Sequence, residues 1–508
     1  MAPASSLAAA VASTTMALAK RQDEAPAAPL VDSGANAWVM ASAALVLLML
    51  PGLGYFYSGL SHHKNALVFL HLCMLSLAIV SIQWFLWGFS LSFSPNSTNG
   101  FIGDIHFMGF RNVDAQPYPG TVISTDVFAM FQGLFCALTA ALPFGSAADR
   151  TRVLPSLFFI VIWATFVYNP IAYWAWAPNG WLRTRGYLDF AGGAAVEIAS
   201  GFAGLAFALY MGPRKTRIID EKPHNVGYVI LGTAMLWFGW LGFNAGSATS
   251  ADARAGMALI TTHLCGATAG LTWMLCEYVP SKKYSAVGFC TGAVAGLVSI
   301  TPAAGFVAPW AAVVIGVVSG SVCRWVSVMT KKGGRLDDTL DVFAVHGVGG
   351  IIGTLLTGVF AQEWIIGLNS TGTGGVIEGH WHQLLVQFYA TVAAAAYTFV
   401  VTYIIFFLLD HLPGLHLRVK DDQEAMGVDL AQMGEYAYNY QRAESSLNPV
   451  AGFGSMSLDP LTEKTTSQSV VPMATFRDNS QALRQVQAIS GNNNVGGDER
   501  HVEMNLSR

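Results

Sequence analysis

Residues 188–212 read LDFAGGAAVEIASGFAGLAFALYMG and contain only two charged side chains, Asp189 and Glu197. A helix needs about 20 consecutive, mainly apolar residues to cross the hydrocarbon core of a bilayer. A charged side chain at that depth is costly in free energy, so it marks a candidate functional site. The stretch therefore predicts a transmembrane helix that carries an ionisable residue, Glu197, near its middle.

The composition of the whole chain points the same way. Of its 508 residues, 53% are hydrophobic and only 11% are charged, whereas ordinary soluble domains have about 25% charged residues. The mean hydropathy is +0.45. The formal net charge of −4 provides no basic surface for nucleic acid. The six cysteines lie in apolar runs without CxxC or CxxH spacing, so we expect buried free thiols, no metal site and no cofactor. This composition excludes a soluble enzyme.

We predict an all-α polytopic membrane protein with eleven transmembrane helices. Each of eleven apolar stretches is long enough to span a bilayer. The stretches are 37–60, 66–93, 122–147, 153–176, 187–212, 225–249, 255–280, 284–303, 308–330, 341–362 and 383–412.

The loops between these stretches predict the orientation. One set of alternate loops carries twelve basic residues: Lys64, Arg150, Arg152, Arg214, Lys215, Arg217, Lys222, Lys282, Lys283, Lys331, Lys332 and Arg335. The other set carries four: Arg111, Arg183, Arg185 and Arg254. Because basic loops stay in the cytoplasm, we expect the N-terminus outside and the C-terminus in the cytoplasm.

This orientation divides the chain into three parts. Residues 1–34 form an extracellular segment, 35–412 the membrane domain and 413–508 a cytoplasmic tail. The tail is rich in Ser, Gln and Asn with few large apolar residues, so we expect 441–508 to be mostly disordered. Glycosylation sequons beginning at Asn96 and Asn369 lie in outside loops, whereas the one at Asn505 lies in the tail.

A second ionisable residue, His346, lies in residues 337–358, DDTLDVFAVHGVGGIIGTLLTG. Asp338 precedes His346 by eight residues, just as Asp189 precedes Glu197. The two segments are the fifth and tenth of eleven, which predicts a five-plus-five inverted repeat whose binding site lies where the halves meet. Glu197 and His346 would then face each other across one path. The alternatives are a protonated Glu197 that caps a neighbouring backbone group and a packed core His346.

The two aspartates have a simpler interpretation. Asp189 and Asp338 lie near the starts of their helices, where a carboxylate is favoured by the helix dipole and can cap backbone N–H groups. We therefore interpret both as structural support.

Aromatic residues give a further signal. Phe135, Trp176 and Phe243 lie in or at the outer ends of their spans, where they could attract a small cation through cation–π contacts or anchor the chain at the membrane interface. Residues 242–247, GFNAGS, form a short polar break that could fray its helix and offer Ser247 as a ligand oxygen.

Taken in order, these motifs resemble the ammonium transporter family (Amt/Mep/Rh), over roughly residues 35–440. The motifs are Pro51-Gly52 with Tyr57-Ser58-Gly59-Leu60, Asp189-Phe190-Ala191-Gly192-Gly193 followed by Gly201, Gly204, Gly212 and Arg214, Gly242-Phe243-Asn244-Ala245-Gly246-Ser247, Asp337-Asp338-Thr339-Leu340-Asp341-Val342-Phe343 leading to His346-Gly347-Val348-Gly349-Gly350, and Gly427-Val428-Asp429-Leu430 with Gly434-Glu435-Tyr436-Ala437-Tyr438. The chain looks most similar to fungal plasma-membrane ammonium permeases.

The resemblance implies a homotrimer in the plasma membrane, in which each protomer has its own narrow hydrophobic pore for ammonium, ammonia and methylammonium. It implies that Trp176 and Ser247, with Phe135, form the outer ammonium site, and that Phe135 and Phe243 form a stacked gate. Residues 413–440 correspond to an ordered regulatory part of the tail, where a kinase or another regulatory partner could act.

The chain departs from the commonest family pattern at one position. His346 matches the second of a pair of pore histidines, whereas Glu197 replaces the first. A carboxyl group opposite an imidazole can form an ion pair or remain protonated, and the two groups titrate as a coupled pair. We predict electrogenic import, with the proton passing through Glu197 and His346.

Two other functions are compatible with the same residues. The first is an ammonium sensor, or transceptor, that signals through the cytoplasmic tail. The second is a membrane enzyme with Glu197 and His346 as general base and acid, which the lack of an accompanying nucleophile, metal set or phosphate loop disfavours.

Overall fold

Apolar helices dominate the computed structural model, which describes residues 31–215, 222–332 and 336–438. Ten helices in these ranges are long and apolar enough to cross a membrane. They are Ser33–Leu60, His63–Phe93, Thr125–Ser146, Val153–Trp176, Gly193–Met211, Val226–Gly246, Ala253–Ser281, Pro309–Lys332, Phe343–Phe360 and Trp381–His411. Another apolar helix, Ala286–Ile300, is shorter. Within the described residues there is no β-strand, so the all-helical prediction is confirmed.

Each of the eleven predicted stretches corresponds to one of these helices, and the two largest differences are helices that are shorter than predicted. The stretch 187–212 becomes helical only at Gly193, and the stretch 284–303 is helical only over Ala286–Ile300. The helix Ala286–Ile300 ends where it does because residues 301–307 form turns that contain Pro302 and Gly305.

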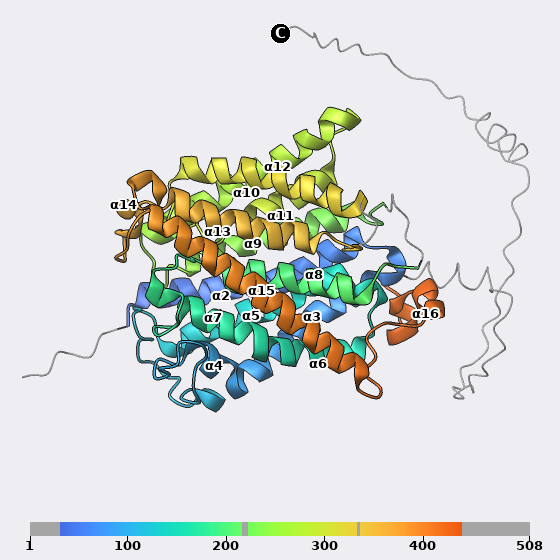
Figure 1. Ribbon diagram of the computed structural model, residues 1–508, viewed down its shortest axis with the longest axis horizontal. Helices are drawn as coiled ribbons and strands as arrows, with labels where there is room; N and C mark the ends of the chain where they lie inside the picture. The colour runs from blue at the N-terminus through green and yellow to red at the C-terminus, as the bar shows by residue number, and fades with distance from the viewer. Residues whose placement is uncertain (1–30, 216–221, 333–335, 439–508) are drawn as a thin grey trace, which may run out of the picture. The chain divides into compact units, whose positions relative to one another are not determined.

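The bundle packs closely where small residues line the helices. Helix α2 (Ser33–Leu60) lies along α9 (Val226–Gly246), and α10 (Ala253–Ser281) packs against α11 (Ala286–Ile300) and α12 (Pro309–Lys332) (Figure 1). A Cβ added at Gly232 would lie 2.3 Å from the backbone nitrogen of Phe56. Glycine therefore lets the two backbones approach, as expected for membrane helices.

Four of the spans contain a π-helical turn. These turns are η2 (Trp84–Gly88), η6 (Ala164–Tyr168), η8 (Gly193–Ile198) and η9 (Phe343–Gly347). The turn η2 joins α3 (Ala66–Gln83) to α4 (Phe89–Phe93), and η6 joins α6 (Val153–Trp163) to α7 (Asn169–Trp176). The turns η8 and η9 open α8 (Ala199–Met211) and α13 (Val348–Phe360). Turns of this kind occur frequently at functional sites.

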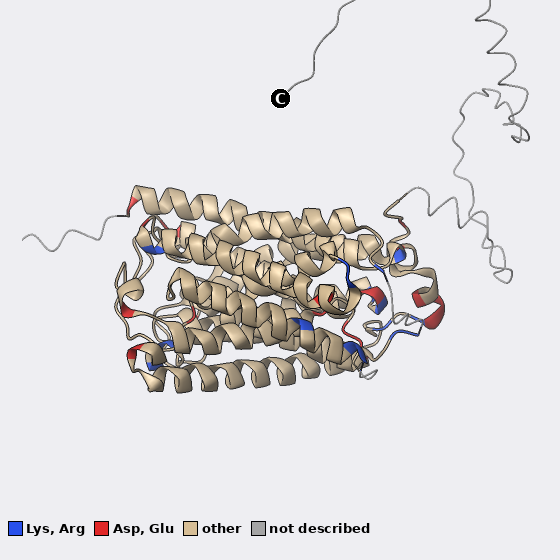
Figure 2. Cartoon of the chain, turned by 90° about the horizontal axis from the view of Figure 1, so that it is seen from above, with Lys and Arg blue, Asp and Glu red and all other residues tan. Residues whose placement is uncertain are grey.

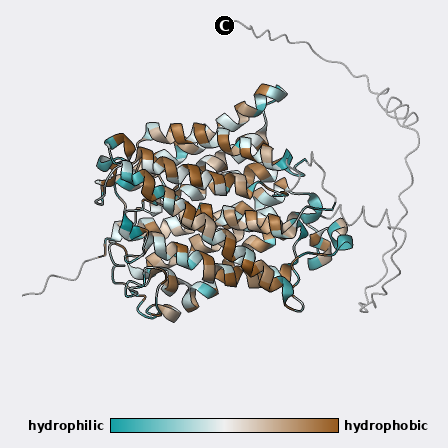
Figure 3. Cartoon of the chain, viewed as in Figure 1, coloured by the Kyte–Doolittle hydropathy of each residue, from teal (hydrophilic) through white to brown (hydrophobic). Residues whose placement is uncertain are grey.

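Polar and apolar residues separate along the helices. Figure 2 shows that most Lys, Arg, Asp and Glu lie toward the two ends of the helices. Figure 3 shows hydrophobic residues along their middle sections. This distribution is what a bilayer requires, because charged side chains are stable only near its polar surfaces. All six cysteines are free, and five of them are buried.

The first part of the tail contacts the ends of the helices. After α15 (Trp381–His411), the chain forms α16 (Asp421–Met426) and the turn η11 (Asp429–Met433). The carboxylate of Asp429 accepts hydrogen bonds from the backbone N–H groups of Leu67 and Val68, each at 2.8 Å. Residues 1–30 and 439–508 lie outside the described residues. The predictions for most of the extracellular segment, for disorder of the tail over 441–508 and for the sequon at Asn505 therefore concern residues that the structure does not describe.

Candidate functional site

Glu197 and His346 form a direct contact in the interior. Nδ1 of His346 lies 2.8 Å from Oε2 of Glu197, and the two side chains are 5% and 1% exposed. Oε1 of Glu197 is buried and has no hydrogen-bond partner among the described residues. The pair therefore keeps one carboxylate oxygen free for a small molecule that can donate a hydrogen bond.

Two aspartates fix the turns that carry this pair. Asp189 accepts hydrogen bonds from the backbone N–H groups of Gly192, Gly193 and Ala194 at 2.8, 2.6 and 2.9 Å, where η8 begins. Asp338 accepts from the N–H of Phe343 at 2.8 Å, where η9 begins. Each carboxylate thus satisfies N–H groups that a helix start leaves unpaired.

Glycines let the two segments meet. A Cβ at Gly201 would lie 2.0 Å from the backbone nitrogen of Gly347, directly after His346. A Cβ at Gly350 would lie 2.8 Å from the Cβ of Glu197. No side chain fits in either gap, so glycine at these positions sets the distance between the acid and the imidazole.

A narrow cavity lies beside the pair. It has a volume of about 10 Å³, and its lining is mostly apolar, with Leu53, Leu138 and Trp240 next to Glu197 and His346. A volume of this size holds one water-sized molecule. Ammonia is of that size, and an apolar wall favours it over its charged form because burial of an unpaired ion is far more costly.

A second, wider cavity lies on the other side of an aromatic pair. Its volume is about 570 Å³, and its lining includes Trp176, Ser247, Asp189, Gln132 and Arg254. We call it the outer cavity, after the predicted orientation. It brings together the two residues, Trp176 and Ser247, that the sequence placed at an outer ammonium site.

Phe135 and Phe243 form an aromatic pair in the interior. Their rings stack with centroids 3.9 Å apart and planes 15° from parallel, and both are fully buried. Along α5 (Thr125–Ala141), Gln132 lines the outer cavity and Leu138 the narrow one, so Phe135 lies between these two residues on the helix. This position is compatible with the predicted gate, although neither ring is part of the lining of either cavity.

Ser247 is held in an orientation that leaves its oxygen free to accept. Its hydroxyl donates to the carbonyl of Phe243 at 2.8 Å. The helix α9 continues through Gly246, so the expectation that residues 242–247 fray was wrong. Local intrahelical hydrogen bonds outweighed the helix-breaking tendency of the two glycines. Trp176 is positioned by its indole N–H, which donates to the carbonyl of Asp189 at 3.1 Å.

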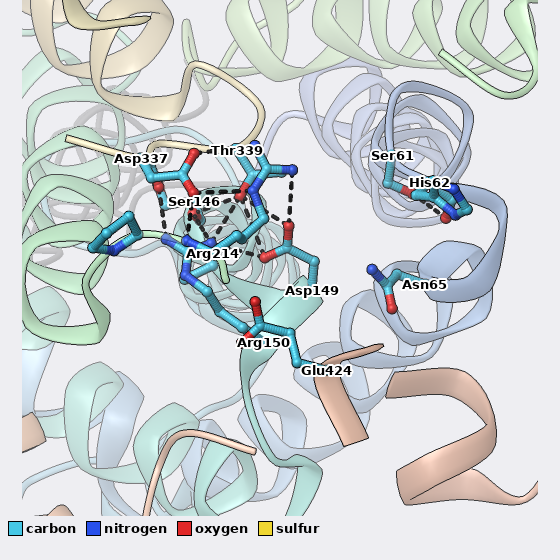
Figure 4. Close-up of polar contacts among 12 residues, drawn as sticks. Ser61, His62, Asn65, Ser146, Asp149, Arg150, Arg214, Asp337, Thr339 and Glu424 are labelled. Atoms are coloured by element: carbon cyan, nitrogen blue, oxygen red, sulfur yellow. Dashed lines mark hydrogen bonds and ion pairs between the residues drawn. The ribbon is translucent and has the colours of Figure 1, made fainter. Parts of the chain in front are cut away.

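A buried polar cluster at the opposite end of the path fixes the segment that carries Asp338 (Figure 4). Arg150 is fully buried and donates to Asp149 at 2.8 Å, to the Thr339 hydroxyl at 2.9 Å and to the Asp337 carbonyl at 2.6 Å. Arg214 bonds both carboxylate oxygens of Asp337 at 3.0 Å. We call these five residues the inner cluster.

The adjacent carboxyl groups of Asp337 and Asp338 have pKa values that are shifted in opposite directions. Burial alone would raise the pKa of Asp337, but hydrogen bonds and charge from Arg214 lower it to about 2. Burial, with the nearby negative charge of Asp341, raises the pKa of Asp338 to about 6. Asp337 is thus a permanent anion, whereas Asp338 can take up a proton in mildly acidic conditions.

Sequence reasoning missed several residues of the outer cavity. Gln132 is buried there, and its Oε1 has no hydrogen-bond partner among the described residues. Arg254 donates to the side chain of Asn369 at 2.7 Å and to the carbonyl of Gly305 at 2.9 Å. Gln132 precedes Phe135 by three residues on the same helical face, which is the signal that could have found it. Arg254 and Asn369 meet only through tertiary folding.

The chain is similar in sequence and in fold to several known proteins. Residues 37–438 match the model of the Ammonium Transporter Family. Ammonium transporter 1 of Schizosaccharomyces pombe is 44% identical over 441 residues, which cover 86% of this chain and 88% of the relative. The crystal structure of Saccharomyces cerevisiae Mep2 superposes with a TM-score of 0.73 at 43% identity, covering 77% of this chain and 91% of that one. A structure described as a sensor Amt protein has a TM-score of 0.71 at 30% identity, with 78% and 98% covered.

Proposed function

The chain belongs to the ammonium transporter family, and we propose that it imports ammonium by binding the cation outside, removing a proton and conducting ammonia past Glu197 and His346. Transport of ammonium by a multi-pass membrane protein follows from the family itself, and so does the conclusion that the chain is no enzyme. The steps of the mechanism are our proposal.

The first step is recruitment in the outer cavity. The face of an indole attracts a cation, and Trp176 lines this cavity together with Ser247. The Ser247 hydroxyl has already donated to Phe243, so its oxygen presents lone pairs to the N–H groups of ammonium or methylammonium. Phe135 lies next to this site, with its ring centroid 6.3 Å from that of Trp176.

The second step is deprotonation at the stacked gate. Ammonium has a pKa near 9, so it is charged at neutral pH. Carrying that charge into a dry, apolar cavity of about 10 Å³ would cost far more free energy than carrying neutral ammonia. We therefore place the loss of the proton at or before the rings of Phe135 and Phe243.

The third step is passage beside the acid and the imidazole. The contact of 2.8 Å between Glu197 and His346, in the wall of a cavity for one small molecule, is the observation that carries this proposal. Ammonia can donate to the free Oε1 of Glu197 as it passes. The proton follows through the same pair, so the net transport moves charge.

Reconstitution tests this mechanism. Purified protein in liposomes should give a saturable current on addition of ammonium or methylammonium and none with potassium. His346→Ala should lose the current. If the unaltered protein gives no current while an internal pH dye still reports ammonium uptake, the protein conducts neutral ammonia. That result would overturn the electrogenic step.

The larger architecture extends this proposal. The eleven apolar helices, with the paired Asp189–Glu197 and Asp338–His346 segments, support a five-plus-five inverted repeat and one extra helix, with the N-terminus outside. A homotrimer in the plasma membrane is part of the same proposal. The contacts of residues 413–438 with the helix ends support a regulatory role for the tail, open to a kinase or another partner.

The second candidate function is that of an ammonium sensor signalling through the tail. Only the 30%-identical sensor Amt structure favours it, whereas the 44%-identical relative is named a transporter. Truncation after residue 412 discriminates between the two functions. A transporter without its tail keeps the ion selectivity of its pore. A sensor without its tail loses only the downstream signalling response.

A further inference from the structure

The outer cavity has an unexpected charge for a cation site. The charged residues among those that line it are Asp189, Arg183 and Arg254, which gives the described lining a formal charge of +1. An ammonium ion that enters this cavity therefore passes two guanidinium groups in its wall, and the nearby carboxylate of Asp252, which bonds Asn369 at 2.8 Å, compensates only Arg254.

Two of these three charged side chains, those of Asp189 and Arg254, stabilise the structure around the cavity. Asp189 accepts three backbone hydrogen bonds at the start of η8. Arg254 is 7% exposed, binds Gly305 and Asn369, and lies over the rings of Phe190 and Phe306 at 5.2 and 4.9 Å. Replacement of either residue would disturb the fold of the cavity.

Arg183 differs from both. Its side chain is solvent-exposed, and it forms no ion pair with a described carboxylate. Its Nη1 donates a hydrogen bond to the backbone carbonyl of Trp176 at 2.7 Å, at the C-terminus of α7. This bond places the guanidinium beside the residue whose ring receives the cation, well within the Debye length of about 10 Å at 0.1 M salt.

We infer that Arg183 sets the affinity of the outer site by repelling ammonium electrostatically, an inference that rests on the proposed recruitment at Trp176. Two like charges separated by less than a Debye length at a wet surface interact by an amount that changes a binding constant about two- to fivefold. Arg183 should act on binding rather than on conduction, because it lines the outer cavity and not the narrow cavity beside Glu197 and His346.

A matched control lies two residues away. Arg185 is also exposed and belongs to the same 3₁₀ turn, but its guanidinium lies over the ring of Trp181 at 5.3 Å and does not line the outer cavity. Replacement of Arg185 removes the same formal charge from the same loop without changing the charge of the cavity wall.

The experiment measures methylammonium uptake into proteoliposomes as a function of concentration for Arg183→Gln, Arg183→Lys and Arg185→Gln. Arg183→Gln should lower KM about two- to fivefold at 20 mM ionic strength with unchanged maximal rate, and the difference should shrink at 500 mM sodium chloride. Arg183→Lys and Arg185→Gln should keep the original KM.

Three outcomes would overturn the inference. A higher KM in Arg183→Gln would mean that the arginine orients Trp176 through its carbonyl. An unchanged KM would mean that its charge is not felt at the site, and an equal decrease in Arg185→Gln would mean that only overall surface charge matters. Lack of uptake by the unaltered protein would instead contradict the proposed function, so the two failures can be told apart.

Discussion

His346 and Glu197 are 149 positions apart in the sequence, yet Nδ1 of one lies 2.8 Å from Oε2 of the other. Each comes from a π-helical turn, and each turn follows a capping aspartate. The contact is buried, so the two groups cannot titrate independently. A proton on either one is shared by the pair, and the substrate passes beside it.

Replacement of Glu197 tests the proton path. Glu197→Gln keeps the size and one hydrogen bond to His346 but cannot accept a proton at neutral pH. We expect the ammonium-evoked current to fall at least about tenfold, which corresponds to about 1.4 kcal/mol. Current recordings on liposomes, with protein content matched, check this. Undiminished current in both Glu197→Gln and Glu197→Ala would remove Glu197 from the mechanism.

A methyl group at Gly201 should separate the pair. Because a Cβ there would lie 2.0 Å from the nitrogen of Gly347, Gly201→Ala must push η9 away from α8. We expect lower thermal stability and loss of current. Gly256→Ala is the control, since a Cβ at Gly256 in α10 meets nothing within 4 Å. If both variants have the melting temperature and the current of the unaltered protein, the close approach of the two backbones is not what holds Glu197 and His346 together.

The stacked gate should determine selectivity. Phe243→Ala and Phe135→Ala would connect the two cavities, so we expect potassium to carry current beside ammonium. Phe131→Ala is the control, because Phe131 is buried in the same helix, 4.8 Å from the ring of Phe135, and is not part of the stacked pair of Phe135 and Phe243. Each substitution should cost about 3–5 kcal/mol of stability, but only the two gate variants should lose selectivity. Equal ion selectivity in all three would rule out a gating role.

The dependence of stability on pH should report Asp338. Its folded-state pKa is raised to about 6, above the ordinary value of 3.8. Its protonated form is therefore favoured in the folded protein, and this contribution to stability is complete below pH 4 and lost as pH rises through about 6. Asp338→Asn should flatten the change in melting temperature between pH 4 and pH 7. A steeper dependence in that variant would show that the sign is wrong.

The two outer sequons should behave differently. The side-chain nitrogen of Asn369, to which a glycan would attach, donates to Ser250 at 2.9 Å and to Asp252 at 2.8 Å, whereas that of Asn96 has a single exposed contact, with Nδ1 of His106 at 3.0 Å. A glycan would break these contacts at the outer cavity. In a eukaryotic host, Asn96→Gln should therefore remove any shift in electrophoretic mobility caused by deglycosylation, whereas Asn369→Gln should not. Retention of the shift in Asn96→Gln and its loss in Asn369→Gln would contradict this.

The sequence alone predicted the helices and the pairing of Glu197 with His346, because the helices and these two residues leave local signals in the sequence. Long apolar runs mark membrane helices, and the equal spacing of Asp189 from Glu197 and of Asp338 from His346 indicated related segments. The π-helical turns were not foreseen, since an extra residue in a turn has no signature in an all-apolar stretch. The inner cluster was also missed, because Arg150, Arg214 and Asp337 meet only through long-range packing.

The two π-helical turns that carry Glu197 and His346 also restrict how this chain can change in length. A π-turn holds one residue more than the α-helical turn that would replace it. Deletion of a single residue within Gly193–Ile198 would replace the π-turn by an ordinary α-helical turn and shift Glu197 by one position relative to the cap at Asp189. The acid would then no longer be held opposite Nδ1 of His346. A substitution in one of these turns keeps the positions of Glu197 and His346 in their helices. A single insertion or deletion there changes one of these positions and removes the conducting path.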